Sequence, residues 1–496
     1  MRRRLILGGP GTGKTTRLLQ LIESFLEAGV HPANIAFVSF TRAAAREARE
    51  RATTRFGYEE SDLPWFRTIH SLCYHELGLR RGDIMQKRDW FAFAEWIGNP
   101  LTLRSGMDAN DDSVCCTATK GDKMLFLVNY ASAKGITIAD AWSQVDTGMD
   151  IELFEVERFA SGLLKYKETF RKIDYPDFLD KYLAGGDRLP VDVAIIDEAQ
   201  DLSTKQWSVV RKAFSGVNEI VVGADDDQAI FSWSGADVKH VLGLKGYEIE
   251  VLPISYRLPA KIFEHAENLV SRIQERYEKE WAPRADGSLG KVSFDVDIND
   301  VPLGKLPGSW FLLCRNKFFM PLLEEFCQLR GLNYATASED SAVREDEAEA
   351  IMAWNLLCAQ KTVSLDHARV LLRFTGQRRH LKEDRQYTIE EIEPYPGSSR
   401  FGWEYVLKIP DDRKAFYGAL ETRGALFEEP NVYIGTIHSV KGAEADHVLV
   451  LPDATRTTME NSSEDDERRV AYVACTRARE TLWVTAPNSL WSIPIQ

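Results

Sequence analysis

The feature that most constrains this chain is a glycine-rich segment close to its first residue. Residues 8–15 read Gly-Gly-Pro-Gly-Thr-Gly-Lys-Thr and fit the pattern G-x-x-x-x-G-K-[ST]. The apolar run Leu5-Ile6-Leu7 precedes the segment, and residues 15–28 follow it with apolar side chains at helical spacing. The order strand, loop, helix lets successive backbone N–H groups and a helix N-terminus face phosphate oxygens. The segment therefore predicts a phosphate-binding loop.

The polar residues of this loop have expected roles. The Lys14 ammonium supplies positive charge to the β- and γ-phosphates, and the Thr15 hydroxyl is a ligand for Mg²⁺. The predicted nucleotide-binding residues of the loop are Gly8, Gly9, Pro10, Gly11, Thr12, Gly13, Lys14, Thr15 and Thr16. The motif alone does not distinguish a kinase, a GTPase and a motor protein.

A second motif favours hydrolysis. The apolar run of residues 191–196 ends at Asp197 and Glu198, which places two adjacent carboxylates where a strand ends beside a phosphate loop. A carboxylate at that position holds Mg²⁺ in P-loop proteins, and we assign this role to Asp197. We assign to Glu198 the polarisation of the attacking water. The pair favours hydrolysis over phosphoryl transfer to a metabolite.

Short apolar runs recur along the chain and predict two α/β domains. The first set, at residues 35–38, 191–196 and 219–222, is typical of a parallel sheet flanked by helices. The second set lies at residues 310–313, 432–434, 448–451 and 481–484. Residues 80–190 have a mostly helical pattern, which is clearest over residues 90–96 and 154–182. We expect a polar insertion at residues 362–428 and an acidic loop at residues 461–466.

Composition limits the partners and the compartment. The 496 residues carry a net charge of −14, so a polyanion must meet a local basic groove rather than a basic coat. The seven cysteines are odd in number and include no C-x-x-C pair, which is typical of a reducing compartment. No apolar run reaches the length of a membrane span, and the apolar run after Met1-Arg2-Arg3-Arg4 is too short for a signal peptide. We expect a cytoplasmic protein.

Residues 223–236, Gly-Ala-Asp-Asp-Asp-Gln-Ala-Ile-Phe-Ser-Trp-Ser-Gly-Ala, resemble the third motif of the superfamily 1 helicases of the UvrD/Rep/PcrA type. In that family the glutamine, here Gln228, senses the γ-phosphate. The aromatic residues, here Phe231 and Trp233, stack on bases of single-stranded DNA. A phosphate sensor and a base platform a few residues apart would couple the state of ATP to the grip on a strand.

Other segments resemble further motifs of this family, in the same order. They are residues 38–45 (motif Ia), 68–72 (Ib), 174–179 (a landmark before the carboxylate pair), 255–257 (IV), 436–444 (V) and 467–478 (VI). The resemblance implies that Tyr256 stacks on adenine, that Glu444 binds the nucleotide, and that Arg257 and Arg477 reach the γ-phosphate. The implied DNA contacts are Phe40, Thr41, Arg42, Thr68, His70, Phe231, Trp233, Thr436, His438 and Lys441.

The fold that the resemblance implies is an α/β fold of two RecA-like P-loop motor domains with two insertions. Domain 1A would comprise residues 1–79 and 190–252, and domain 2A residues 253–361 and 429–496. A helical 1B insertion would comprise residues 80–189, and a reduced 2B-like insertion residues 362–428. The expected catalytic residues are Lys14, Asp197, Glu198, Gln228, Arg257 and Arg477, and the expected Mg²⁺ ligands are Thr15 and Asp197.

The implied function is an ATP- and Mg²⁺-dependent 3′→5′ translocase and helicase on single-stranded DNA and its junctions with duplex. A loading, repair or replication protein is an expected partner, and a membrane is not. Only Met1 to Arg4 precede the first predicted strand, which leaves little room for the glutamine motif that reads adenine in the family. Ser234 stands where the family has an arginine in motif III. The short segment after motif VI predicts weak strand separation. This leaves two alternatives: a DNA-stimulated ATPase that remodels protein–DNA complexes, and a non-catalytic nucleic-acid-binding scaffold, which the complete residue set disfavours.

Overall fold

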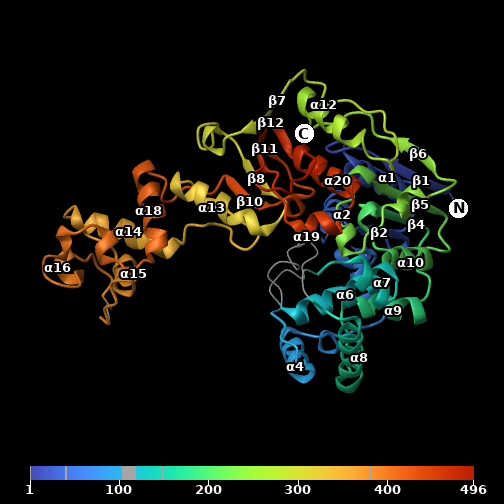
Figure 1. Ribbon diagram of the computed structural model, residues 1–496, viewed down its shortest axis with the longest axis horizontal. Coiled ribbons are helices and arrows are strands. Elements are labelled where there is room, and N and C mark those ends of the chain that lie inside the picture. The colour runs from blue at the N-terminus through green and yellow to red at the C-terminus, as the bar shows by residue number, and fades with distance from the viewer. Residues whose placement is uncertain (1, 40–41, 103–118, 148–149, 380, 382) are drawn as a thin grey trace. The chain divides into compact units, whose positions relative to one another are not determined.

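The computed structural model describes residues 2–39, 42–102, 119–147, 150–379, 381 and 383–496, which form two compact units (Figure 1). The first unit comprises Met1–Ile298, Cys314–Phe318 and Ile437–Gln496, and the second comprises Asn299–Leu313 and Phe319–Thr436. The finer division into domains 1A, 1B, 2A and 2B stays a prediction.

The first sheet has six strands in the order β3-β2-β4-β5-β1-β6. Its pairings are parallel, as the apolar runs predict. The strands are β1 (Arg2–Leu7), β2 (Ile35–Ser39), β3 (Phe66–Thr68), β4 (Val193–Asp197), β5 (Glu219–Ala224) and β6 (Glu248–Val251). Because parallel strands share one carboxyl edge, the residues that follow β1, β4 and β5 come together there, and these are the phosphate loop and the two acidic motifs.

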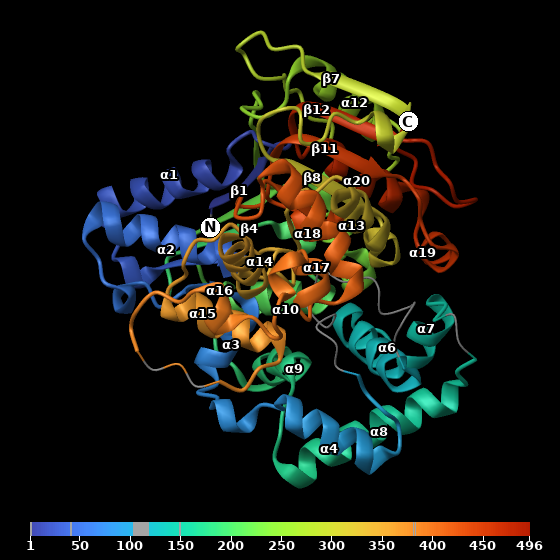
Figure 2. The same cartoon turned by 90° about the vertical axis from the view of Figure 1, so that its left-hand side faces the viewer.

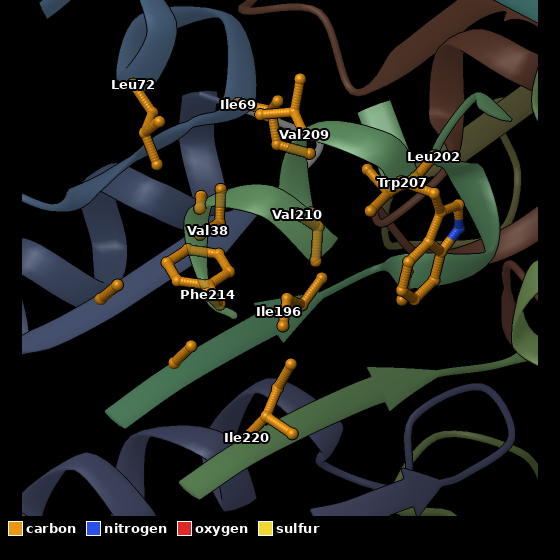
Figure 3. Close-up of a cluster of buried hydrophobic side chains, with 14 of the residues drawn as sticks. Val38, Ile69, Leu72, Ile196, Leu202, Trp207, Val209, Val210, Phe214 and Ile220 are labelled. Atoms are coloured by element: carbon orange, nitrogen blue, oxygen red, sulfur yellow. The ribbon is translucent and has the colours of Figure 1, made fainter. Parts of the chain in front are cut away.

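Both faces of this sheet are buried, which explains why its strands are continuous apolar runs. Ile195 belongs to a core cluster with Leu18 and Ile22 of α1 (Lys14–Glu27), whereas Ile196 belongs to the cluster on the other face. The second cluster includes residues of α3 (Ile69–Glu76), α9 (Tyr175–Gly185) and α10 (Thr204–Ala213). Figure 3 shows Trp207, Val209 and Val210 of α10 among these side chains, near Ile196 and Ile220 of the sheet.

Between β3 and β4 the residues that the structure describes are mostly helical, as predicted. It forms α4 (Lys87–Ile97), α6 (Lys120–Lys134), α7 (Ile138–Gln144) and α8 (Leu153–Phe170), which lie together in Figure 2 and share their own apolar core. The stretch predicted over residues 154–182 is two helices, α8 and α9. The break occurs at Arg171, which has a left-handed φ of 51°, and α9 restarts with Asp174 as its N-cap.

The second sheet has the strand order β7-β12-β11-β8-β10-β9. Its strands are β7 (Lys291–Val296), β8 (Trp310–Cys314), β9 (Tyr334–Ala335), β10 (Val432–Thr436), β11 (Ala445–Leu451) and β12 (Ala478–Thr485). The second set of predicted strands is therefore confirmed. The first unit also contains α2 (Arg42–Phe56), α11 (Lys239–Leu242), α12 (Ala260–Val270) and α19 (Arg456–Asn461).

The predicted acidic loop at residues 461–466 is wrong. Asn461 ends α19, and α20 (Glu464–Cys475) begins only three residues later with Ser463 as its N-cap. The first turn of α20 is acidic throughout, from Glu464 to Glu467. Negative side chains are favourable at a helix N-terminus, where the backbone N–H groups carry partial positive charge. The acidic run is therefore a helix-start signal rather than a loop signal.

Outside its strands the second unit is mostly helical, and a buried polar contact joins two of its helices. Its helices are α13 (Met320–Leu329), α14 (Glu345–Cys358), α15 (Leu365–Thr375), α16 (Ile389–Ile392), α17 (Trp403–Val406) and α18 (Asp411–Arg423). The buried Glu347 carboxylate accepts hydrogen bonds from the Tyr417 hydroxyl at 2.6 Å and from Arg413 at 2.8 Å. These bonds fasten α18 to α14. Across the described residues of both units, no helix is long and apolar enough to cross a membrane.

Removing the Trp207 side chain should be costly, because the indole is 2% exposed in the core of the first unit. We expect Trp207→Ala to lower the free energy of unfolding by about 3–5 kcal/mol, the range for large aromatic deletions. The measurement is urea denaturation followed by circular dichroism. Leu164→Ala is the control, since Leu164 is 57% exposed and should change stability by no more than about 0.5 kcal/mol. Equal losses in both variants would contradict this assignment of the core.

Candidate functional site

The phosphate loop has the backbone conformation that its glycines permit. Gly11 and Gly13 have φ values of 71° and 81°, a region that side-chain-bearing residues avoid. Helix α1 begins at Lys14, so its N-terminus opens toward the loop. The Lys14 ammonium donates a hydrogen bond to the Gly8 carbonyl at 2.7 Å and lies 3.9 Å from the Asp225 carboxylate. The lysine thus folds back over the loop, where a phosphate would offer the same kind of acceptor.

The loop also has close neighbours that leave no room for larger residues. A Cβ atom on Gly9 would lie 2.5 Å from the Trp281 ring, and one on Gly11 would lie 2.4 Å from the Arg257 Cβ atom. Trp281 packs edge-on against Phe263, with ring centroids 4.8 Å apart, and its indole N–H donates to Glu267 at 2.7 Å. The glycines therefore serve close packing as well as backbone conformation.

Thr15 and Asp197 lie together as the sequence predicts. The Thr15 hydroxyl donates to the Asp197 carboxylate at 3.1 Å. Burial, followed by the charge of Glu198, raises the pKa of Asp197 to about 7. A bound divalent cation would favour the ionised form of Asp197. A hydroxyl and a carboxylate are also the hard oxygen donors that Mg²⁺ prefers. The pair fits a Mg²⁺ site.

Glu198 is held in an uncommon conformation. Its φ of 52° is left-handed, although glutamate has a side chain, and such a backbone persists only where the surroundings fix it. The Gln200 amide donates to the Glu198 carboxylate at 2.5 Å. Burial alone would raise the pKa of Glu198, but the charges of Lys441 and Lys14 and the bond from Gln200 hold it below its usual value. The carboxylate is therefore ionised at neutral pH and able to accept a proton.

Gln228 joins motif III to motif VI. Its amide donates to Asp225 at 2.6 Å, and its side-chain oxygen accepts a hydrogen bond from the Arg477 guanidinium at 2.9 Å. Arg477 is 1% exposed, and burial and the neighbouring charge of Arg257 lower its pKa to about 9. The arginine thus reaches the predicted sensor from a segment 249 residues further along the chain.

Arg257 and Tyr256 lie beside the loop in different ways. Arg257 donates to the Glu444 carboxylate at 2.5 Å and to the Thr476 carbonyl at 3.2 Å. Tyr256 is 76% exposed, and its ring would lie 3.9 Å from a Cβ atom on Gly13. An exposed aromatic face next to a phosphate loop offers a platform for a base.

A buried charge cluster that the sequence analysis missed supports motif III. The Lys279 ammonium lies 2.6 Å from Asp226, 2.7 Å from Asp227 and 3.4 Å from Asp225, and Arg276 forms two bonds to Asp227. Burial alone would lower the pKa of Lys279, but the three carboxylates raise it well above its usual value. The three aspartates lie close enough together to hold a metal ion, but each of them faces the Lys279 ammonium, which offsets part of their charge. Lys279 stands in no motif, so only tertiary structure identifies it.

The residues predicted to stack on bases form an aromatic cluster of Phe231, Trp233 and His438. Their ring centroids lie 5.9 to 6.5 Å apart. Phe231 is 3% exposed and His438 1% exposed, whereas Trp233 is partly exposed. Burial lowers the pKa of His438 well below its usual value, so the ring is neutral. In this arrangement Trp233 is the member with a surface to offer a base.

Lys441 lies under the aromatic cluster. Its ammonium is 5.1 Å from the Phe231 ring centroid and donates to the Asp201 carboxylate at 2.5 and 2.6 Å. Burial raises the pKa of Asp201 to about 7, and the charge of Lys441 opposes this rise. The Lys441 ammonium is therefore paired with a buried carboxylate rather than exposed to bind a DNA strand.

The remaining predicted strand contacts are Phe40, Thr41, Arg42, Thr68, His70 and Thr436. Phe40 and Thr41 lie outside the described residues, as does the Arg42 side chain, while Thr436 is buried at the end of β10 in the second unit. Thr68 caps α3 by accepting a hydrogen bond from the Ser71 N–H at 3.3 Å. His70 lines a cavity of about 320 Å³, and burial lowers its pKa to about 4. Arg46, Arg49, Arg67 and Tyr175 also line this cavity. Three arginines therefore line one cavity of the first unit.

Two parallel sheets and a phosphate loop at the carboxyl edge of the first place the chain among the RecA-like P-loop proteins. Within that class it belongs to the UvrD/REP helicase family. Residues 2–98 and 153–246 match the UvrD/REP helicase N-terminal domain, and residues 418–489 match the UvrD-like helicase C-terminal domain. The matched segments together cover just over half of the chain.

Curated relatives carry the name ATP-dependent DNA helicase PcrA. The protein of that name from Bacillus subtilis is 24% identical over 408 residues, which are 74% of this chain and 52% of the relative. The one from Staphylococcus aureus is 26% identical over 300 residues, which are 57% of this chain and 40% of the relative. The chain thus spans about half of the length of these relatives or less.

The geometry of the loop predicts the effect of one added methyl group. Gly11→Ala combines backbone strain of about 1–3 kcal/mol with a clash against Arg257. We expect it to weaken the binding of a fluorescent ATP analogue about tenfold or more, since 1.4 kcal/mol is a factor of ten. Gly29→Ala is the matched control: Gly29 has a φ of 87° and open space around its Cβ position. It should leave nucleotide affinity unchanged, and an equal loss in both variants would exclude the clash as the cause.

Proposed function

We propose that this protein is an ATP-dependent DNA helicase motor that translocates 3′→5′ on single-stranded DNA. The observation that carries the proposal is the contact of Arg477 with Gln228, because it links a predicted γ-phosphate sensor to a buried arginine from a distant segment. Gln228 lies three residues before Phe231, the start of the aromatic cluster. The names of the curated relatives support the same activity.

The residues of the site suit the chemistry of ATP hydrolysis. Lys14 and the N-terminus of α1 would hold the phosphates, and Thr15 and Asp197 would hold Mg²⁺, which neutralises charge on the β- and γ-oxygens when bound. Glu198 would orient the attacking water and accept its proton. Arg257 and Arg477 would offset the charge that develops on the transferred phosphoryl group, and Gln228 would detect its loss.

We propose that Tyr256 stacks on the adenine and that Glu444 contacts the ribose side. Tyr256 is suited because its ring is exposed beside the loop. Glu444 accepts a hydrogen bond from Arg257, so nucleotide binding would compete with that contact and release Arg257 toward the phosphates. The exchange would make closure of the site depend on the nucleotide.

The DNA-binding side of the proposal rests on stacking. A strand held by aromatic faces can be gripped without regard to sequence. Trp233 offers such a face directly, whereas Phe231 and His438 would become available only when the aromatic cluster opens. Opening and closing of the cluster with the state of ATP would convert hydrolysis into stepwise movement.

Two substitutions separate nucleotide binding from hydrolysis. Lys14→Ala should abolish hydrolysis, because the β- and γ-phosphates lose their counter-ion. Glu198→Gln should keep ATP binding and lose turnover, because an amide cannot accept the proton. Phosphate release with and without single-stranded DNA measures turnover, and a fluorescent ATP analogue measures binding. Wild-type turnover in either variant would rule out the assigned roles.

Trp233→Ala should weaken binding to single-stranded DNA by about 1–3 kcal/mol, the value of one lost stacking platform. It should also reduce the stimulation of ATPase by DNA. Fluorescence anisotropy of a labelled oligonucleotide measures the affinity. Trp96→Ala is the matched control, since Trp96 is 47% exposed on α4 and has no predicted strand contact. Unchanged affinity in Trp233→Ala would make Trp233 a packing residue.

Direction and strand separation are tested by two assays on one preparation. A fluorophore at the 5′ end of a single strand should report arrival of the motor, and one at the 3′ end should not. A 3′-tailed duplex should be separated slowly relative to translocation, since separation costs about 1.4 kcal/mol of stacking per step. A signal from the fluorophore at the 3′ end alone would show that the motor moves 5′→3′ and contradict the proposed direction. Translocation with streptavidin displacement but no duplex melting would favour a remodelling ATPase instead.

A further inference from the structure

A buried ion pair connects the aromatic cluster to the catalytic carboxylate. Lys441 donates to both oxygens of Asp201 and also to the Gln228 carbonyl, at 2.5 Å. The Lys441 side chain is 9% exposed and that of Asp201 is 2% exposed. A buried ion pair adds little net stability compared with an apolar pair of the same shape. Stability alone therefore does not explain why this pair is present.

On one side, the pair holds the turn that carries Glu198. Asp201 closes the short helix Ala199–Asp201, and its N–H donates to the Glu198 carbonyl at 3.0 Å. Glu198 is the residue just before this helix and has a left-handed φ of 52°. The middle residue of the turn, Gln200, binds the Glu198 carboxylate and accepts a hydrogen bond from the Asp225 N–H at 3.1 Å. A shift of Asp201 would therefore move the carboxylate proposed to act on water.

On the other side, the pair touches the residues proposed to grip DNA. The Lys441 ammonium lies 5.1 Å from the Phe231 ring centroid, and the His438 ring hydrogen-bonds the Ile230 carbonyl at 3.1 Å. Lys441 follows His438 by three residues, and the two are joined by a backbone bond from the Lys441 N–H to the His438 carbonyl at 3.3 Å. A base that opens the aromatic cluster would therefore move Lys441.

We infer that Asp201 and Lys441 are positioning residues that transmit the occupancy of the aromatic cluster to Glu198. The inference rests on the proposed function and adds to it the route by which single-stranded DNA stimulates hydrolysis. Neither side chain needs to contact ATP. Strand binding would shift Lys441, Lys441 would carry Asp201 with it, and the turn would place the Glu198 carboxylate for reaction. The element that changes state is the turn, whose strained conformation a small displacement can relieve.

The test uses Asp201→Asn, which keeps the shape of the side chain and removes its charge. We expect the maximal DNA-stimulated kcat to fall about tenfold, within the 2- to 30-fold range of substitutions along a coupling network. The KM for ATP and the affinity for single-stranded DNA should each stay within about threefold of wild type, because the variant removes no contact to either ligand. A merely structural role would alter these constants together.

A double-mutant cycle with Lys441→Met tests whether the two residues act as one unit. If they do, Asp201→Asn combined with Lys441→Met should stimulate no worse than Lys441→Met alone. Glu219→Gln is the control, since it removes a partly buried ion pair with Arg4 at the opposite edge of the same sheet. That variant should retain full stimulation by DNA.

The outcomes separate the inference from the proposed function. No DNA-stimulated ATPase in the wild type would overturn the proposed function and the inference with it. Stimulation in the wild type that persists in Asp201→Asn, or additive losses in the cycle, would overturn the inference alone. If Asp201→Asn does not fold by circular dichroism, Lys441→Met alone answers the question, because it keeps the length of the side chain and removes its charge. Full stimulation in Lys441→Met would then exclude the link.

Discussion

The candidate site depends on a single contact between distant parts of the sequence, the hydrogen bond from Arg477 to Gln228. A guanidinium that is almost fully buried is costly, and here the carboxylates of Glu198 and Glu444 offset part of that cost. Gln228 in turn is held by Asp225, and Asp225 by Lys14 and Lys279. The phosphate loop, the carboxylate pair and the arginine thereby belong to one network of contacts. A charge introduced at one of these points changes the electrostatic environment of the others.

Local patterns were enough to predict the part of the site that lies in continuous segments. The phosphate loop follows from its glycines, and the strand that ends at Asp197 follows from its apolar run. These signals are strong because backbone conformation and edge position are set within a few residues. The approach of Thr15 to Asp197, the second set of strands and the helical segment after β3 agree with the predictions for the same reason.

The contacts that tune the site could not be predicted, since they are made between segments with no shared pattern. Lys279 and Arg276 stand in no motif, yet they form the ion pairs that hold the aspartates of motif III. Asp201 reads in sequence as one more acid after the carboxylate pair, and only its distance to Lys441 gives it a role. The acidic run before motif VI misleads in the opposite way, because the same charges are favourable in a loop and at a helix start. The burial of Phe231 and His438 is a further tertiary fact that aromatic identity alone did not reveal.

The packing of Trp281 on Gly9 has an optical consequence. The indole lies against the backbone at Gly9, packs edge-on against Phe263 and donates a hydrogen bond to Glu267. Its emission depends on the polarity and the charge around the ring, so movement of the loop changes the signal without any label. The chain thus contains an intrinsic fluorophore at the point where phosphates would enter, and replacing other tryptophans would isolate its signal for stopped-flow measurements of each opening and closing of the loop.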